Sequence, residues 1–364
     1  MKFEELIKDP FFDLPLTQPC GMAFDKYIEE ILNTFLRKID ELDDGELKVY
    51  NDIPSDKGLI KTTQAKIVNS LINCLKEYLN GYPHKAYNIL DNLFTNEVKS
   101  FYGTFNLIGT GVPKNFYRIR LREDNQNKSY SPSNLFHIPF SDRGKVSSQR
   151  YSIPGFPSLY LSETLYVCWE ELNRPDINKF EAVRLKAIKS LRLLDLSPPE
   201  EKTNKLTRDV FYHIMKWPLI ACCSVKVYNP SDAFKPEYII PQLLLQWVRS
   251  NDELDGIKYK SNHIEPTLYK QAGELYNIVL PVKGTAYDGH CSALKESFEV
   301  TEVISWQLYQ LTLGGQTFLQ SGKSPLDLKL PKLELIKGMS FPYSYSTLGK
   351  LEEQLDNMTT HKID

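Results

Sequence analysis

The spacing of apolar residues predicts helices in the first hundred positions. Apolar side chains recur every three or four positions in FDKYIEEILNTFLRKIDEL (residues 24–42) and in QAKIVNSLINCLKEYLNG (residues 64–81), which ends at Asn-Gly. A third stretch, PHKAYNILDNLF (residues 83–94), begins with a proline, as the first turn of a helix often does. This period is that of amphipathic helices. We therefore expect a helical domain or arm over residues 1–108, serving packing and interaction rather than chemistry.

The pattern changes near residue 110 to short β-type runs separated by turn residues. Period-two alternation and β-branched or aromatic residues predict strands at FYRIRL, SLYLS, EAVRLKAI, LRLLDL, GIKYKS and LYNIVLPV. Helical spacing predicts helices at ETLYVCWEEL, LTRDVFYHIMKW and IPQLLLQWVR. The mixture predicts an α+β domain over residues 109–310.

The last segment, residues 311–364, is predicted to be an extension and tail. It contains LTLGGQTF and LKLPKLELI, which favour closing strands or a hairpin, and then a polar stretch that we expect to fray.

Composition and charge narrow the class of protein. The 364 residues are 41% hydrophobic and 25% charged, which is typical of a globular chain, and the net charge of -2 provides no field for a polyanion. We therefore expect no nucleic-acid partner. The longest apolar runs, IIPQLLLQWV and WPLIACC, are too short to cross a bilayer. With no apolar leader at the start, the sequence favours a cytoplasmic protein.

The common motifs of metal and nucleophilic enzymes are absent from the sequence. The six cysteines form no C-x-x-C pair, the histidines are scattered singly, and there is no P-loop, G-x-G-x-x-G, H-E-x-x-H or G-x-S-x-G. We therefore expect no metal site, buried cysteine thiols, and structural or surface histidines.

Three short patches remain as candidates for chemistry. Alternation in FYRIRL places Arg118 and Arg120 on one strand face with Phe116, which suits either solvent or a phosphate-bearing ligand with a planar base. In SLYLS, Tyr160 points away from its leucine neighbours, either into the core or toward a ligand. Ser261 ends GIKYKS, as a strand end, a cap or a hydrogen-bonding group.

The helix predicted after SLYLS carries two adjacent carboxylates. Its apolar stripe is Leu165, Cys168, Trp169 and Leu172. Glu171 lies at the margin of this stripe and can reach a cleft, whereas Glu170 lies opposite and is expected to be solvated. Glu171 is then either a salt-bridge partner or a group that binds sugar hydroxyls and stabilises an oxocarbenium-like transition state.

The order of these patches resembles the RES domain family, which is named for an arginine, a glutamate and a serine and includes the toxins of bacterial toxin-antitoxin pairs. The resemblance rests on YRIR, then QRYSIPGFPSLYLSETLYVCWEEL, then DGIKYKS, and covers roughly residues 110–310. It leaves the N-terminal helical region and the C-terminal tail outside. The implied fold is similar to that of ADP-ribosyltransferases, a compact mixed sheet with flanking helices.

The resemblance also implies roles for individual residues. Arg118, Glu171 and Ser261 match the three signature residues and are the implied catalytic set. Arg150 matches the arginine of a Gly-Arg-aromatic segment, and Tyr160 matches the tyrosine of a Leu-Tyr strand. With Arg120 and Tyr151, the aromatic after Arg150, they form the implied substrate-binding set. The sequence departs from the family where Gln149 replaces glycine and Lys260 replaces a frequent proline.

The activity implied by the resemblance is degradation of NAD+ at the bond between nicotinamide and ribose, with water or inorganic phosphate as acceptor. NAD+ is then a substrate, and no cofactor is expected. One alternative is transfer of ADP-ribose to a protein or nucleic acid, and another is an inactive regulatory or scaffold protein on a RES-like core. The implied partner is an antitoxin or another regulatory protein, and the sequence does not choose between this and a homo-oligomer.

Overall fold

The computed structural model describes residues 1, 3–43, 57–98, 107–109, 114–123, 128–197, 208–264, 275–313, 326–327, 330, 333–336 and 339–363. Chain contacts divide it into two compact units, each built from separate segments. Unit 1 comprises residues 1–107, 148–153 and 194–252, and unit 2 comprises residues 108–147, 154–193 and 253–364. The fold is α+β, as predicted.

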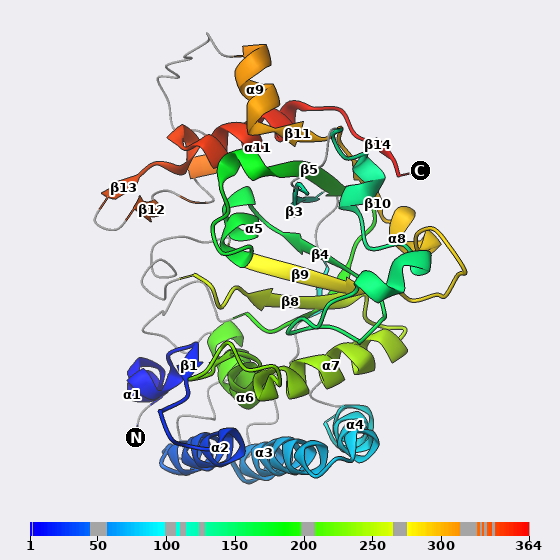
Figure 1. Cartoon of the computed structure of the whole chain (residues 1–364). Coiled ribbons are helices and arrows are strands. Elements are labelled where there is room, and N and C mark those ends of the chain that lie inside the picture. Colours follow the sequence, from blue (N-terminus) through cyan, green and yellow to red (C-terminus); the bar gives the residue numbers. More distant parts are fainter. Residues whose placement is uncertain are drawn as a thin grey trace. The chain divides into compact units, whose positions relative to one another are not determined.

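Unit 1 is mainly helical (Figure 1). It contains α1 (Phe3–Lys8), α2 (Phe24–Asp40), α3 (Lys57–Leu79), α4 (Pro83–Asn92), α6 (Arg208–Cys223) and α7 (Ile239–Ser250), together with the short strands β1 (Leu16–Thr17) and β7 (Val225–Lys226). The three long helices predicted in the first hundred residues are confirmed.

Helices α6 and α7 pack with α3 in unit 1, although the sequence interpretation placed them in the α+β domain. Both are strongly apolar, and each contributes a buried tryptophan. Trp217 stacks on Phe35 of α2 with ring centroids 5.4 Å apart, and Trp247 lies 4.8 Å from Phe94. The apolar faces of the N-terminal helices thus find partners more than a hundred residues later in the chain.

Unit 2 is built on a mixed sheet. The strands that lie wholly within this unit follow the order β14-β10-β5-β3-β4-β9-β8, and β11 also pairs with β5. Their bounds are β3 (Lys114–Leu121), β4 (Ser158–Ser162), β5 (Phe180–Ala187), β8 (Gly256–Lys260), β9 (Tyr276–Pro281), β10 (Phe298–Val300), β11 (Ile304–Ser305) and β14 (His361–Lys362). The boundary between the units falls inside β2 (Leu107–Gly109) and β6 (Arg192–Asp195).

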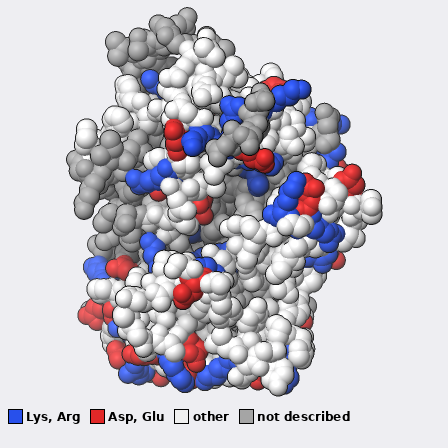
Figure 2. Space-filling view, viewed as in Figure 1, with Lys and Arg blue, Asp and Glu red and all other residues white. Residues whose placement is uncertain are grey.

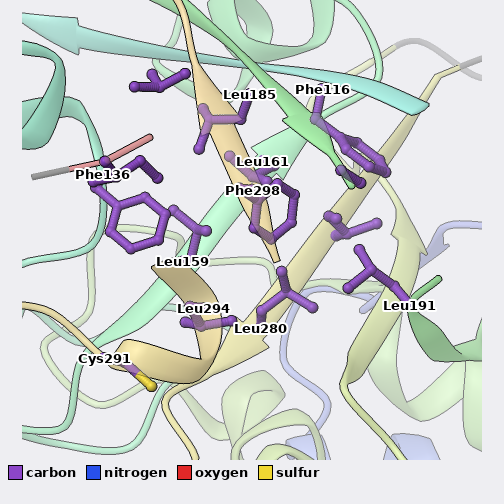
Figure 3. Close-up of a cluster of buried hydrophobic side chains, with 14 of the residues drawn as sticks. Phe116, Phe136, Leu159, Leu161, Leu185, Leu191, Leu280, Cys291, Leu294 and Phe298 are labelled. Carbon is purple, nitrogen blue, oxygen red and sulfur yellow. The ribbon is translucent and has the colours of Figure 1, made fainter. Parts of the chain in front are cut away.

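Two apolar clusters cover the two faces of this sheet. The first joins Phe116, Leu159 and Leu161 to Phe298 and to the segment around Phe136 (Figure 3). The second joins Tyr117 and Ile119 to helices α5 (Leu165–Glu171) and α11 (Thr347–Asn357). The alternation predicted along FYRIRL is confirmed for its apolar residues, because Phe116 belongs to the first cluster and Tyr117 and Ile119 belong to the second.

The prediction that the polar C-terminal stretch frays is wrong. Leu348, Leu351 and Leu355 recur at helical spacing and are almost fully buried in α11, and β14 then adds to the sheet edge. The strand predicted in LKLPKLELI is confirmed as β12 (Leu333–Ile336), but within the described residues it pairs with β13 (Met339–Phe341), which was not predicted, rather than with LTLGGQTF. Leu311–Leu313 of LTLGGQTF lie in helix α9 (Trp306–Leu313) rather than in a strand, and its remaining residues lie outside the described ones.

The described surface carries both signs of charge. On the face shown in Figure 2, lysine and arginine side chains lie among aspartates and glutamates. No helix among the described residues is both long enough and apolar enough to cross a membrane.

Candidate active site

Five of the seven predicted site residues belong to unit 2. Arg118 and Arg120 lie on β3, Tyr160 on the adjacent strand β4, Glu171 in the last turn of α5, and Ser261 directly after β8. The three signature residues therefore belong to the same unit as Tyr160 and Arg120. Arg150 and Tyr151 belong to the other unit, unit 1.

Glu171 is held by a chain of hydrogen bonds from the sheet. Ser162 and Asn277 face each other across β4 and β9, and the Ser162 hydroxyl donates to Asn277 Oδ1 at 2.6 Å. Asn277 Nδ2 then donates to Glu171 Oε1 at 2.8 Å. Both sheet residues are buried, whereas 29% of the Glu171 side chain is exposed. One carboxylate oxygen is thus fixed while the group as a whole stays accessible to a ligand.

His263 lies beside the other oxygen of this carboxylate, and Ser261 holds its backbone. His263 Nε2 is 3.9 Å from Glu171 Oε2, and the backbone N–H of His263 donates to the buried hydroxyl of Ser261 at 3.2 Å. Ser261 thereby fixes the turn that presents the His263 ring to Glu171. The geometry agrees with a hydrogen-bonding role for Ser261.

Arg118 lies where β3 and β4 separate. The two strands pair at Tyr117 with Ser162, and beyond this pair Arg118 Nη1 donates to the carbonyl oxygen of Tyr160 at 3.0 Å. Its Nε is buried and has no hydrogen-bond partner within the described part of the chain. Burial lowers the pKa of Arg118 to about 10, and Arg120 acts in the same direction. A guanidinium with an unused buried donor is well suited to bind an anionic group.

The charges of Arg118 and Glu171 both shift the pKa of the buried Cys168 thiol. Burial raises the pKa of Cys168 to about 12, while Arg118 lowers it and Glu171 raises it. Cys168 lies on α5, and its thiol donates to the carbonyl oxygen of Tyr117 at 3.3 Å. The elements that carry these two charges pack together, since α5 contacts β3.

Tyr160 lies on β4, the strand next to that of Arg118. Its neighbours Leu159 and Leu161 enter the first apolar cluster, so its side chain takes the opposite face with Ser162 and Asn277. Burial raises its pKa and Arg118 opposes that shift, which leaves a neutral phenol at physiological pH. A partly buried phenol beside a guanidinium can contact a planar ring.

Arg120 is engaged by a nearby loop. Its Nη1 donates to the carbonyl oxygen of Asn134 at 2.8 Å, and its guanidinium carbon lies 4.3 Å from the centre of the Tyr130 ring. Arg120 is therefore engaged by this loop, whereas Arg118 keeps a buried Nε that has no partner among the described residues, so Arg118 is better suited to bind an anion.

Arg150 binds backbone carbonyls inside unit 1. Nη1 donates to the carbonyl oxygens of Cys223 and Glu237 at 3.2 and 3.4 Å, and Nη2 donates to that of Val225 at 3.1 Å. The guanidinium also lies 5.3 Å from the centre of the Tyr238 ring. These contacts join the end of α6, strand β7 and the start of α7. Tyr151 is buried in the same unit.

Replacing Arg150 with lysine should lower the melting temperature by several degrees. An ammonium cannot reach three carbonyls with the fixed geometry of a guanidinium, and we expect a loss of about 1–3 kcal/mol of stability. Thermal unfolding followed by circular dichroism measures this effect, with the exposed Arg37→Lys in α2 as the matched control. A melting temperature equal to that of the control, combined with weaker substrate binding, would support the substrate-binding role instead.

The prediction that Glu170 is solvated is wrong. Glu170 is 4% exposed and accepts two hydrogen bonds from Arg174, from Nε at 3.0 Å and from Nη2 at 2.8 Å. The chain after α5 takes positive φ angles at Asn173 (58°) and Arg174 (55°), which turns Arg174 back onto the helix. The helical wheel did not include this turn, because it treats the helix as isolated.

Three contributors to the site escaped the sequence analysis. Ser162 and Asn277 are polar residues within apolar strands, and this signal could have marked them as side chains that need a partner. His263 was assigned a structural or surface role, but it lies beside Glu171. Only the fold brings these residues to α5.

Comparisons with known proteins found one family model and one similar protein. The model of the RES domain family matches residues 115–286, which run from β3 to just after β9. The chain is also 30% identical to a protein of Bacillus subtilis (strain 168) named "Putative toxin YopC", in an alignment that covers 93% of this chain and 77% of that protein. No solved structure matches the chain.

Proposed function

Because the chain belongs to the RES domain family, we propose that it degrades NAD+ by cleaving the bond between nicotinamide and ribose. The observation that carries this proposal is the buried Arg118 Nε, which has no hydrogen-bond partner among the described residues, together with the partly exposed Glu171 carboxylate that Asn277 orients in the same unit. A dinucleotide offers the matching chemistry, because its pyrophosphate is anionic and its ribose becomes cationic as the glycosidic bond breaks.

In this proposal the binding residues orient the dinucleotide. Arg118 donates to the pyrophosphate with Arg120 in support, and Tyr160 contacts the nicotinamide ring. Ser261 holds the turn that carries His263, which keeps the ligand side of Glu171 in place. The carbonyl contacts of Arg150 favour a structural role in unit 1 over direct binding.

Glu171 supplies the catalytic charge. As the C–N bond breaks, its electron pair leaves with nicotinamide, which departs as a neutral ring, and positive charge grows on the ribose. The carboxylate, oriented by Asn277, stabilises this charge. Water, or an oxygen of inorganic phosphate, then forms the new bond to the ribose carbon, and water loses its proton in this step. In this proposal the exposed side of Glu171 or the His263 ring accepts that proton.

Loss of NAD+ from a cell would also account for the word "toxin" in the name of the Bacillus subtilis relative. We extend the description "toxin" from that protein to this chain, and we propose that a partner protein restrains the activity in the cell.

The test is incubation of the purified protein with NAD+, with and without inorganic phosphate. Release of nicotinamide and loss of NAD+ are followed by chromatography, and mass spectrometry identifies the second product. ADP-ribose indicates hydrolysis, and its phosphate ester, formed only with phosphate present, indicates phosphorolysis. Label from NAD+ on a macromolecule in cell extract would instead indicate transfer. A protein that neither binds nor consumes NAD+ would overturn the proposal.

A further inference from the structure

Helix α11 belongs to unit 2 but lies outside the stretch that the family model matches. It follows residue 286 by about sixty positions, yet it packs against α5 and β5 (Figure 1). Two of its residues, Glu352 and Asp356, are one helical turn apart and therefore lie on the same side of the helix. Each accepts hydrogen bonds from an element that carries a signature residue.

Glu352 holds the beginning of α5. The side chain is fully buried, and Oε2 accepts from the backbone N–H of Leu165 at 2.8 Å and from the Tyr343 hydroxyl at 2.7 Å. Leu165 is the first residue of α5, whose opening N–H groups have no partner within the helix. A carboxylate acceptor gives a short, charge-assisted bond there. Glu171 lies six residues later in the same rigid helix.

Asp356 holds β3 in the same manner. Its Oδ1 accepts from the Tyr117 hydroxyl at 2.6 Å and from Asn115 Nδ2 at 3.0 Å. Arg184 of β5 also contacts this cluster, since it donates to Asn115 Oδ1 at 3.0 Å. Tyr117 directly precedes Arg118, so Asp356 fixes the backbone from which Arg118 extends.

We propose that α11 is a positioning element of the active site. Glu352 sets the start of α5 and thereby the place of Glu171, and Asp356 sets β3 and thereby the place of Arg118. Both carboxylates come from one helix, so α11 fixes the spacing between the catalytic carboxylate and the anion-binding guanidinium. This inference rests on the proposed function for its kinetic consequence. The claim that Glu352 fixes the start of α5 can be tested without any activity measurement.

The kinetic test uses Glu352→Gln and Asp356→Asn, with Glu353→Gln as control. Glu353 is the next residue on α11 and is partly exposed. Small displacements of catalytic groups lower the chemical rate strongly, so we expect kcat for NAD+ loss to fall about tenfold in each of the first two variants. KM should change by less than about twofold in Glu352→Gln and should rise in Asp356→Asn, because Asp356 holds the strand that carries the binding residue Arg118, and the control should match wild type. Wild-type kcat in both test variants would overturn the inference.

A second readout separates this inference from the proposed function. Amide hydrogen exchange of the peptide that contains Leu165–Cys168 should be at least about tenfold faster in Glu352→Gln than in Glu353→Gln, with β9 unchanged. If wild type does not consume NAD+, the proposed function fails, and the exchange result alone decides the inference. Equal exchange in the two variants would overturn it.

Tyr343→Phe covers the case in which Glu352→Gln does not fold. This variant removes only the hydroxyl that orients the Glu352 carboxylate. It should give the same local rise in exchange at Leu165–Cys168, with a smaller drop in kcat. No change in either measurement, in a folded protein, would also overturn the inference.

Discussion

Replacing Glu171 with glutamine should reduce the rate of NAD+ loss about 100- to 1,000-fold. Glutamine keeps the size of the side chain and can still accept from Asn277, but it is neutral and cannot offset the positive charge that grows on the ribose. The fold should be unaffected, because the side chain is partly exposed and its hydrogen bond to Asn277 survives. Nicotinamide release under single-turnover conditions measures the chemical step directly.

Glu170→Gln is the matched control, one residue away on the same helix. Glu170 is buried with Arg174, so its loss of charge should lower the melting temperature and leave the rate per folded molecule unchanged. If Glu170→Gln abolished NAD+ loss and Glu171→Gln did not, the assignment of the catalytic carboxylate would be reversed.

Replacing Arg118 with methionine should weaken NAD+ binding severely and stabilise the fold. Burial lowers the pKa of Arg118 to about 10, so at neutral pH the folded state carries a charge that it disfavours. The lowered pKa therefore reduces the free energy of unfolding. This reduction is fully present below pH 10 and disappears as the pH rises from the folded-state pKa to the unfolded-state pKa. Methionine removes it, and we expect a gain on the order of 2 kcal/mol at pH 7. Binding of NAD+ should fall at least about 100-fold.

Arg122→Met provides the contrast on the following segment. Arg122 Nε lies 3.6 Å from the buried carboxylate of Glu181, so its removal should destabilise the protein. Urea unfolding and calorimetric titration with NAD+ measure both properties in the two variants. Normal NAD+ affinity in Arg118→Met would remove Arg118 from the binding site. A loss of stability would contradict the view that its charge is uncompensated.

The local parts of the site could be predicted from the sequence. Period-two alternation correctly separated Phe116 from Tyr117 and Tyr160 from its leucine neighbours, because a strand inside a two-sided core leaves few other arrangements. The helical wheel placed Glu171 at the edge of α5 but misjudged Glu170, whose burial depends on a turn with two left-handed residues.

The long-range parts could not be predicted in this way. The apolar spacing of α6 and α7 shows that each buries a face, but the spacing does not say that the partner is α3. Likewise, Glu352 and Asp356 look like surface acids on a polar helix, and only the hydrogen bonds to Leu165 and Tyr117 reveal their place in the core. Local sequence patterns identify which faces are buried. Only the tertiary contacts show which element each buried face packs against.

The discontinuous make-up of the two units has a consequence for the newly made chain. Unit 1 lacks its last helix until residue 250 has been added, and unit 2 lacks α11 until residue 357 has been added. A nascent chain that already contains Arg118, Glu171 and Ser261 therefore still lacks the carboxylates that hold β3 and α5. The order of synthesis itself therefore places assembly of the site after residue 357 has been added.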